Sequence, residues 1–270
     1  LDRLGFDYAS VSAANPGIVM CSISGYGSGP LADMKAYDFL VQAESGLVSV
    51  TGTPEAPARC GISLCDISTG LTAYGEILRA LIERSATGHG QFLDISLFDV
   101  LSEWMSVPLA LYQYGGRVLT GTGLDHALIA PYGAYAAKDG LIIIAVQSHR
   151  EWLSLCDTLG CSELASDPRF ATIPLRVQHR EALKSELETR IQRYTRDELA
   201  KILDAGSIAY GRINNVREVW SHPALKTKEV MSRGSTATFV RRVCDAATTP
   251  RVVPALGEHT AAIRQEFGVG

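Results

Sequence analysis

The N-terminal part of the sequence contains a predicted strand, a long helix and a second strand, and this succession most constrains the fold. Residues 18–23 form a largely apolar run, which is typical of a strand buried on both faces of a parallel sheet. Apolar residues then recur at helical spacing from Ile67 to about Arg84, and residues 91–97 alternate as in a strand. Two strands joined through a helix in this way lie parallel. The sequence therefore predicts an α/β fold built on a parallel sheet.

The predicted helix from Ile67 to Arg84 should bury one of its faces. The apolar residues of that face are Leu71, Tyr74, Leu78, Leu81 and Ile82. Asp66 is predicted to lie at or just before the N-cap, where unpaired backbone amides and the helix dipole favour an ionised carboxylate. Asp66 is therefore either a cap, which is the commoner role of an aspartate at a helix start, or a nucleophile.

A glycine-rich loop, Ser24-Gly-Tyr-Gly-Ser-Gly-Pro30, follows the first predicted strand. Its glycines allow the backbone to approach a ligand closely. However, no helix opens on these glycines, so the loop lacks the fingerprint of a dinucleotide site and argues against a nicotinamide oxidoreductase. The next predicted helix, residues 35–46, carries Lys35 and Tyr37 in its first turn. These two side chains form either a solvated helix end or a phosphate contact with an aromatic face beside it.

Glycines between Gly115 and Gly123 indicate a hinge, and a domain boundary is predicted there. Residues 128–146 should form two strands joined by a hairpin at Lys138-Asp-Gly140, and the chain from there to Ala205 should be helical. The predicted parts are a large α/β domain (1–117), a small α+β domain with linkers (118–231) and a C-terminal return to the large domain (232–270).

Composition argues against several classes of function. The net charge of -4 and the pI near 5.9 give no basic surface for nucleic acid or for an anionic membrane. No apolar run approaches the length of a membrane span. The 6 cysteines show no C-x-x-C spacing and lie mostly in apolar runs, as free thiols do. A cytoplasmic protein without a metal site is expected.

Short motifs are distributed over nearly the whole chain. They are Asp2-Arg3-Leu-Gly5, Asn15-Pro16, Ser22-Ile-Ser-Gly-Tyr-Gly27, Tyr37-Asp38, Ser45-Gly46, Asp66-Ile-Ser-Thr-Gly70, Thr87-Gly-His-Gly-Gln91, Pro131-Tyr132, Asp167-Pro-Arg-Phe170 and Leu256-Gly-Glu-His-Thr260. Taken in this order, they resemble the class III CoA-transferase family, which is also called the CaiB/BaiF family. This family includes formyl-CoA:oxalate, carnitine and dicarboxylate CoA-transferases, with α-methylacyl-CoA racemase as a relative.

The resemblance implies a Rossmann-like sheet in the large domain, an interlaced homodimer and a ping-pong transfer of CoA between carboxylates. Asp66 matches the aspartate that attacks the acyl-CoA thioester to give a mixed anhydride and then an aspartyl-CoA thioester. Coenzyme A and acyl-CoA would be substrates, with no permanently bound cofactor. The implied CoA contacts are the phosphate partners Arg3 and Lys35, together with Ala36, Tyr37 and Asp38.

The sequence also departs from the family pattern. Family members begin with a βαβ stretch before the segment that matches Asp2-Arg3, and the sequence lacks it, so we expect an N-terminally truncated chain with little or no transferase activity by itself. The glycine run of formyl-CoA:oxalate enzymes is not matched. The segment Gln147–Trp152 resembles the branch that handles mesaconyl, itaconyl or succinyl groups, which favours a small dicarboxylate substrate.

Two alternatives to a transferase stay open. The racemase branch places a histidine immediately before the aspartate that matches Asp38, whereas this chain has Tyr37. A phenol is protonated at neutral pH and is a poor general base, which disfavours an acyl-CoA racemase or epimerase. The other alternative is an inactive truncated fragment.

Overall fold

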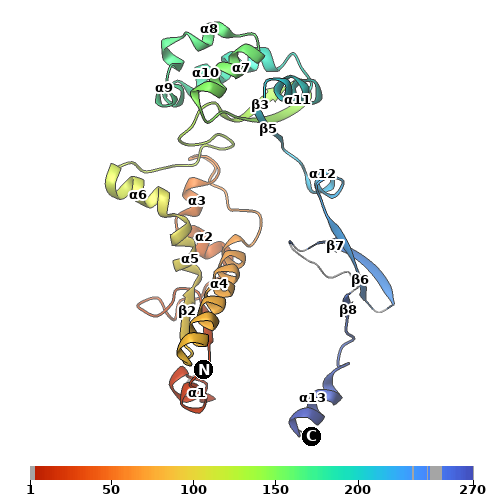
Figure 1. The fold of residues 1–270 in the computed structure, drawn as a ribbon. Coiled ribbons are helices and arrows are strands. Elements are labelled where there is room, and N and C mark those ends of the chain that lie inside the picture. The colour runs from red at the N-terminus through yellow and green to blue at the C-terminus, as the bar shows by residue number, and fades with distance from the viewer. Residues whose placement is uncertain (1–3, 233, 242, 244–250, 270) are drawn as a thin grey trace. The chain divides into compact units, whose positions relative to one another are not determined.

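The structure, a computed structural model, describes residues 4–232, 234–241, 243 and 251–269. The chain divides into two compact units, Leu1–Gly211 and Arg212–Gly270 (Figure 1). The predicted division into residues 1–117, 118–231 and 232–270 stays a prediction. In the described ranges, no helix combines the length and the apolar character that crossing a membrane requires.

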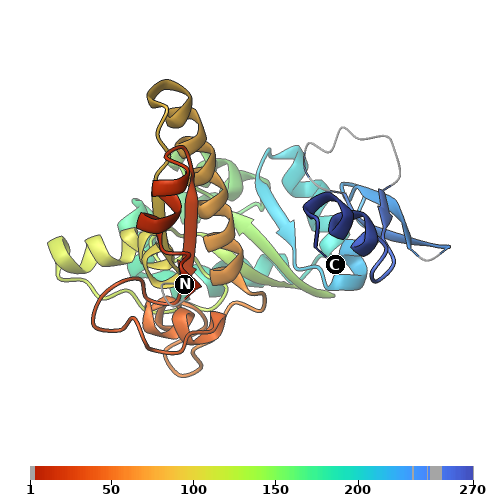
Figure 2. The ribbon, with the colours of Figure 1, turned by 90° about the horizontal axis from the view of Figure 1, so that it is seen from below.

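A parallel pair of strands forms the framework of the first part of unit 1. Strand β1 (Met20–Ser24) pairs with β2 (Phe92–Ser96), in register from Met20 opposite Phe92 to Ser24 opposite Ser96. Helix α4 (Leu64–Thr87) connects the two and runs alongside them (Figure 2). The predicted α/β fold with a parallel sheet is therefore confirmed. The other helices here are α1 (Tyr8–Ala14), α2 (Asp38–Glu44), α3 (Leu47–Val50), α5 (Leu97–Trp104) and α6 (Ser106–Gly115).

The prediction that the first strand is buried on both faces is wrong. The side chain of Ile23 is about half exposed, and the first residues of β1 are only partly buried. Among the described residues, β1 pairs with β2 alone. The described elements that pack on this two-stranded sheet therefore leave part of the apolar run uncovered.

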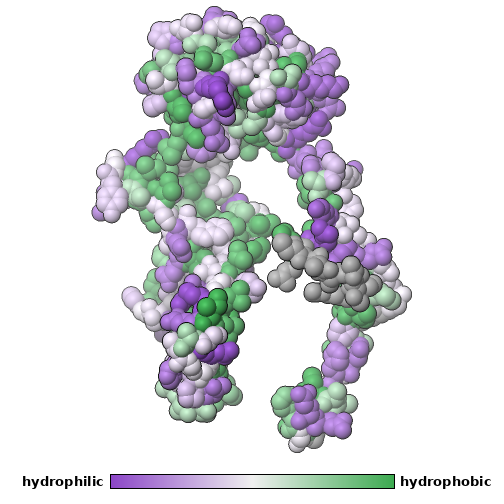
Figure 3. Space-filling model, in the orientation of Figure 1, coloured by the Kyte–Doolittle hydropathy of each residue, from purple (hydrophilic) through white to green (hydrophobic). Residues whose placement is uncertain are grey.

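Helix α4 also differs from its prediction. It begins at Leu64 rather than at Ile67. The apolar face that was expected to be buried is open to solvent: the exposed fractions are 64% for Leu71, 54% for Tyr74, 42% for Leu78 and 74% for Ile82. Leu81 is partly buried. These residues are called the α4 stripe below, and Figure 3 shows hydrophobic side chains at the surface of the part of the molecule that carries it.

The buried face of α4 carries small side chains instead. Ala73 and Ala80 pack with Leu93 and Ile95 of β2 and with Val100 of α5. At 100° per residue, these alanines lie on the side of the helix opposite the α4 stripe. The pattern of large apolar residues therefore identified an apolar face of α4 correctly. The face of α4 that contacts the sheet carries alanines instead, whose small side chains allow the helix to approach the strands closely.

Residues 132–212 form a second region with its own sheet, of order β3-β4-β5. Strands β3 (Tyr132–Ala137) and β4 (Gly140–Ala145) make the predicted antiparallel hairpin, and β5 (Ala209–Arg212) completes the sheet. The helical elements are α7 (His149–Thr158), α8 (Ser162–Ala165), η2 (Pro168–Phe170), α9 (Ile173–Gln178), α10 (Arg180–Ile191) and α11 (Arg196–Ala205). Their apolar side chains enclose a continuous core around Trp152, Phe170 and Leu187.

Unit 2 is a smaller assembly of strands and helices. Strand β6 (Thr227–Ser232) lies between β7 (Ser235–Val240), which is antiparallel to it, and β8 (Arg251–Val253), which is parallel to it. Helix α12 (Val216–Trp220) precedes this sheet, and α13 (Thr260–Phe267) follows it. The parallel pairing of β6 and β8 joins segments that are not adjacent in the sequence.

Candidate active site

The N-terminal ends of three helices meet at the carboxyl edge of the parallel sheet. The strands end at Ser24 and Ser96, which lie opposite each other. Helix α5 starts directly after β2, and the Cys65 thiol of α4 donates to the backbone oxygen of Leu97 in its first turn, at 3.5 Å. The Cys65 amide in turn donates to Asp38, the first residue of α2. Ligands of open α/β sheets bind at this kind of edge, outside the carboxyl ends of the strands.

The glycine-rich loop after β1 is packed into the same edge. Its Gly25 oxygen accepts a hydrogen bond from the amide of Phe98 at 3.1 Å. A Cβ atom on Gly25 would lie 2.3 Å from the Cβ of Ala36, so only glycine fits against the segment that leads into α2. This close approach explains the glycine at position 25 through packing. It also places Ala36 beside the end of β1.

Asp66 lies in the first turn of α4, and the prediction that it lies at or before the N-cap is wrong. Ser63 is the N-cap residue, and it makes no side-chain capping bond. The side chain of Asp66 is exposed, and it has no hydrogen-bond partner among the residues that the structure describes. At this position the helix dipole stabilises a negative charge. Asp66 therefore presents an accessible carboxylate at the sheet edge and is not needed as a cap.

Asp38 takes over the role that a local cap would play. Its Oδ1 accepts the amide N–H of Cys65 at 2.8 Å, and its Oδ2 accepts an N–H of the Gln42 side chain, also at 2.8 Å. Gln42 is fully buried, and its Oε1 accepts the amide N–H of Cys60 at 3.0 Å. A carboxylate from α2 therefore satisfies a backbone donor at the start of α4.

The other residues implied by the resemblance lie near this position, with one exception. Lys35 and Tyr37 are exposed, but they do not lie in the first turn of a helix as predicted: α2 starts at Asp38, Tyr37 is its N-cap residue, and Lys35 lies in the loop before it. Ala36 is partly buried among Val41, Cys65 and Leu101. Through the bond between Asp38 and Cys65, the structure brings the segment 35–38 next to the first turn of α4. Arg3 lies outside the described residues.

The residue next to Asp66 is a cysteine with an unreactive thiol. Cys65 is buried. Burial raises the pKa of its thiol to about 11, and the nearby carboxylates of Asp38 and Asp66 contribute to this rise. The thiolate is the reactive form of cysteine, so a pKa this high leaves the thiol inert at neutral pH. Of these two neighbouring side chains, only Asp66 is exposed at this turn.

Sequence reasoning missed two participants in this site. Gln42 follows Asp38 at the i, i+4 spacing of side chains that meet on a helix, and this spacing could have indicated the pair. The amide of Cys60 gives no signal in the sequence, because a backbone donor becomes visible only once the loop is placed. The hydrogen-bonded chain from Cys60 to Cys65 is therefore a finding of the structure.

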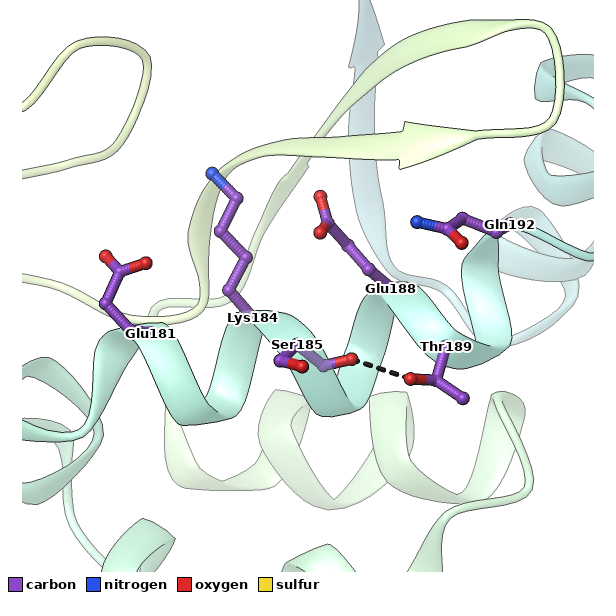
Figure 4. A pocket seen from close by; sticks show the side chains of 6 residues that line it. All are labelled: Glu181, Lys184, Ser185, Glu188, Thr189 and Gln192. Atoms are coloured by element: carbon purple, nitrogen blue, oxygen red, sulfur yellow. Dashed lines mark hydrogen bonds between the residues drawn. The ribbon is translucent and has the colours of Figure 1, made fainter.

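A second recess lies along α10 (Figure 4). It is lined by Glu181, Lys184, Ser185, Glu188, Thr189 and Gln192. The ammonium group of Lys184 lies 3.3 Å from the carboxylate of Asp125, and Glu188 accepts the amide N–H of Ala136 in β3 at 2.9 Å. Glu188 thus joins α10 to β3, and Lys184 joins it to the segment before that strand. In the described part of the chain, no group of three or more His, Cys, Asp or Glu side chains could hold a metal ion.

Comparison with known proteins assigns the family. The sequence model of CoA-transferase family III matches residues 1–260. Because this match spans nearly the whole chain, the chain belongs to CoA-transferase family III.

Relatives and solved structures agree with this assignment. The chain is 32% identical to a succinate–glutarate CoA-transferase of Agrobacterium fabrum, over 99% of this chain and 70% of the relative. It is 36% identical to an acyl-CoA transferase of Fusarium pseudograminearum, over 100% of this chain and 62% of that protein. A crystal structure of a CaiB/BaiF family protein from Brucella suis superimposes with a TM-score of 0.77 at 37% identity, covering 98% of this chain and 72% of the other. The chain thus spans about two thirds of the length of these relatives.

Proposed function

We propose that the chain acts as a CoA-transferase that moves CoA between an acyl-CoA and a small dicarboxylic acid, with Asp66 as the nucleophile. The observation that carries the proposal is the exposed Asp66 carboxylate in the first turn of α4, at the carboxyl edge of the parallel sheet. Its carboxylate group is accessible to a large thioester. The helix dipole supports the ionised form that attacks.

The reaction follows from what a carboxylate can do to a thioester. An oxygen of Asp66 attacks the thioester carbonyl, the C–S bond breaks, and CoA leaves as a thiolate, which gives a mixed anhydride. The thiolate then attacks the Asp66 carbonyl and releases the donor acid, leaving an aspartyl-CoA thioester. An acceptor carboxylate repeats these steps in reverse. No group is oxidised or reduced in any of these steps.

The proposed CoA contacts are Arg3, Lys35, Ala36 and Tyr37. The exposed Lys35 ammonium offers a charge for a phosphate, and Tyr37 offers an aromatic face at the same end of α2. Ala36 lies against the glycine loop, where the backbone comes close. Asp38 was predicted to contact CoA as well, but both of its oxygens accept hydrogen bonds from the protein.

The substrate class, the oligomeric state and the compartment are further proposals. The Agrobacterium relative is named for succinate and glutarate, which supports a dicarboxylate for this chain. The exposed α4 stripe supports a homodimer in which a second copy covers it. The described cysteines, Cys21, Cys60, Cys65, Cys156 and Cys161, are free thiols, which supports a cytoplasmic location.

The test is to trap the covalent intermediate. The chain is incubated with succinyl-CoA and a panel of other acyl-CoAs, and intact mass spectrometry should detect an adduct of CoA that hydroxylamine converts to a hydroxamate at Asp66. Asp66→Asn should lower adduct formation by at least about a thousandfold, since an amide forms no anhydride. The free energy of unfolding should change by no more than about 1 kcal/mol.

Asp197→Asn is the matched control, because Asp197 also occupies the first turn of a helix, α11. It should leave adduct formation unchanged. A racemase would give a different result: exchange of the acyl α-proton in D2O without an adduct on Asp66. Near-normal adduct formation in Asp66→Asn would show that Asp66 is not the nucleophile.

A further inference from the structure

A chain of side-chain hydrogen bonds connects the loop before α4 to the first turn of that helix. The Cys60 amide donates to Gln42, Gln42 donates to Asp38, and the Cys65 amide donates to the other oxygen of Asp38. The three bonds are between 2.8 and 3.0 Å long. Gln42 is fully buried and Asp38 is partly buried. Two side chains of α2 thus hold both ends of the segment from Cys60 to Cys65.

This chain of hydrogen bonds supplies an acceptor for a backbone amide at the start of α4. The first amides of a helix have no acceptor within the helix, and the N-cap residue Ser63 makes no side-chain bond to them. The Cys65 amide depends on Asp38, which lies 27 residues earlier in the sequence. Asp66 is the next residue. The position of its carboxylate therefore depends on a bond to a different helix.

The direction of each hydrogen bond in the chain is fixed by its two ends. Both ends are backbone N–H groups, which only donate. Each of the two side chains between them must therefore accept from one end, and in the bond that joins the two side chains one must donate and the other accept. A carboxylate paired with an amide meets this requirement, as Asp38 and Gln42 do. Two amides place one donor against another, and two carboxylates place one acceptor against another.

We propose that Asp38 and Gln42 are positioning residues that hold the first turn of α4, and thereby the Asp66 carboxylate, in place for attack on the thioester. The inference rests on the proposed transferase function. Under it, Asp38 acts through the protein rather than by contact with CoA. A small displacement of a reacting group is enough to slow a reaction strongly. The hydrogen bonds of Asp38 and Gln42 therefore control the rate of the chemical step at Asp66 rather than the binding of acyl-CoA.

The pairing of donors and acceptors gives a test by exchange. Asp38→Asn sets the new amide NH2 against the NH2 of Gln42, and Gln42→Glu sets two carboxylates together. The double variant Asp38→Asn/Gln42→Glu restores every bond. In it, the introduced asparagine accepts from the Cys65 amide and donates to the introduced glutamate, which also accepts from the Cys60 amide. The double variant also keeps the total charge of the pair.

Two measurements are made on the wild type and the three variants. The first is hydrogen exchange of the Cys65 amide, which reports the bond to position 38 directly and requires no substrate. The second is the rate of CoA adduct formation as a function of acyl-CoA concentration. We expect each single variant to lose protection at Cys65. The adduct rate at saturation should fall about a hundredfold, while the half-saturating concentration changes by less than about threefold. The double variant should recover both.

Three results would overturn the proposal. An Asp38→Asn variant that raises the half-saturating concentration at an unchanged saturating rate would make Asp38 a CoA contact. A double variant in which the Cys65 amide is again protected from exchange but the adduct rate stays low would show that the hydrogen bonds have only a structural role. Unchanged exchange protection of the Cys65 amide in Asp38→Asn would show that these hydrogen bonds do not hold the first turn of α4. If the wild type forms no adduct with any acyl-CoA, the proposed function fails, and the exchange measurement still decides whether the chain fixes the start of α4.

Discussion

The two hydrophobic regions of unit 1 are closed to very different degrees. In the region from Ala130 to Ile208, the closed region, side chains as large as Trp152 and Phe170 are fully buried in one continuous core. In the region from Val19 to Leu101, the open region, the core is made of two small clusters. Its longest helix exposes the α4 stripe. The same chain therefore contains one region that covers its own apolar residues and one that does not.

The candidate site lies in the less covered of these two regions. Asp66 and the segment 35–38 belong to the open region. A large exposed apolar surface marks a place where another surface binds. The candidate site thus lies in the region that leaves apolar surface uncovered, while the closed region buries its apolar side chains in its own core. The predictions below test this contrast with matched substitutions.

The largest expected effect compares one substitution in both regions. Leu187 is fully buried in the closed region, whereas Leu71 is 64% exposed on α4. Leu187→Ala should lower the free energy of unfolding by about 3–5 kcal/mol, because it removes packed methyl groups and leaves a cavity. Leu71→Ala should change it by less than about 0.5 kcal/mol. Urea unfolding of both variants measures the difference, and equal losses would show that a covering surface already packs on α4.

The next largest effect is expected for Arg176, a buried charged residue that connects separate segments of the closed region. Arg176 is almost fully buried, donates to the backbone oxygens of Ala130 and Phe170 at 2.8 Å each, and lies over the ring of Trp152. Arg176→Met keeps much of the volume but leaves two carbonyl groups without donors, which should cost about 2–3 kcal/mol. Arg176→Lys, which keeps one donor group, should lose less. A Met variant as stable as the wild type would show that these bonds contribute nothing.

A smaller effect is expected for association through the α4 stripe. If a second copy covers the stripe, Ile82→Ser should raise the dissociation constant of the dimer by about tenfold or more, from the loss of one buried apolar side chain. The stability of the monomer should stay the same because Ile82 is 74% exposed. Sedimentation velocity over a range of concentrations measures the change. A chain that is monomeric with and without the substitution would contradict the proposed homodimer.

Much of the fold could be predicted from the sequence because it depends on local patterns. The alternation of Leu93 and Ile95 predicted β2, and the turn at Lys138-Asp-Gly140 predicted the hairpin of β3 and β4. Burial could not be predicted in the same way. The periodicity of α4 shows that an apolar face exists, but not whether it packs on this chain or on another surface.

The candidate site was predictable only in part. The resemblance to the family selected Asp66, and local sequence placed it near the start of a helix. Its position within the helix was wrong by one turn at most, because the start of α4 is set by a hydrogen bond to Asp38 rather than by a cap in its own sequence. Contacts between segments that are distant in the sequence leave no mark on the local pattern.

The smallest expected effect concerns how helices begin in the two regions. Helix α11 of the closed region has a complete local capping box, in which Glu198 accepts from the amide and the hydroxyl of Thr195 at 2.9 Å. The backbone bond from Thr195, followed by the bond from its hydroxyl, lowers the pKa of Glu198 below its usual value. Helix α4 has no such box and depends on Asp38.

Because the pKa of Glu198 is lower in the folded chain than in the unfolded one, its contribution to stability is present above the unfolded pKa and is lost as the pH falls through the folded pKa. Glu198→Gln should therefore lower the urea midpoint slightly at neutral pH and not in acid below the folded pKa, where both side chains are uncharged. Asp38→Asn should instead disturb the start of α4 without changing the exchange of amides in α11. If Glu198→Gln lowered the midpoint equally at both pH values, the carboxylate charge would not be the source of the stabilisation. The contrast between helices that cap themselves and a helix held by a distant residue would then rest on α4 alone.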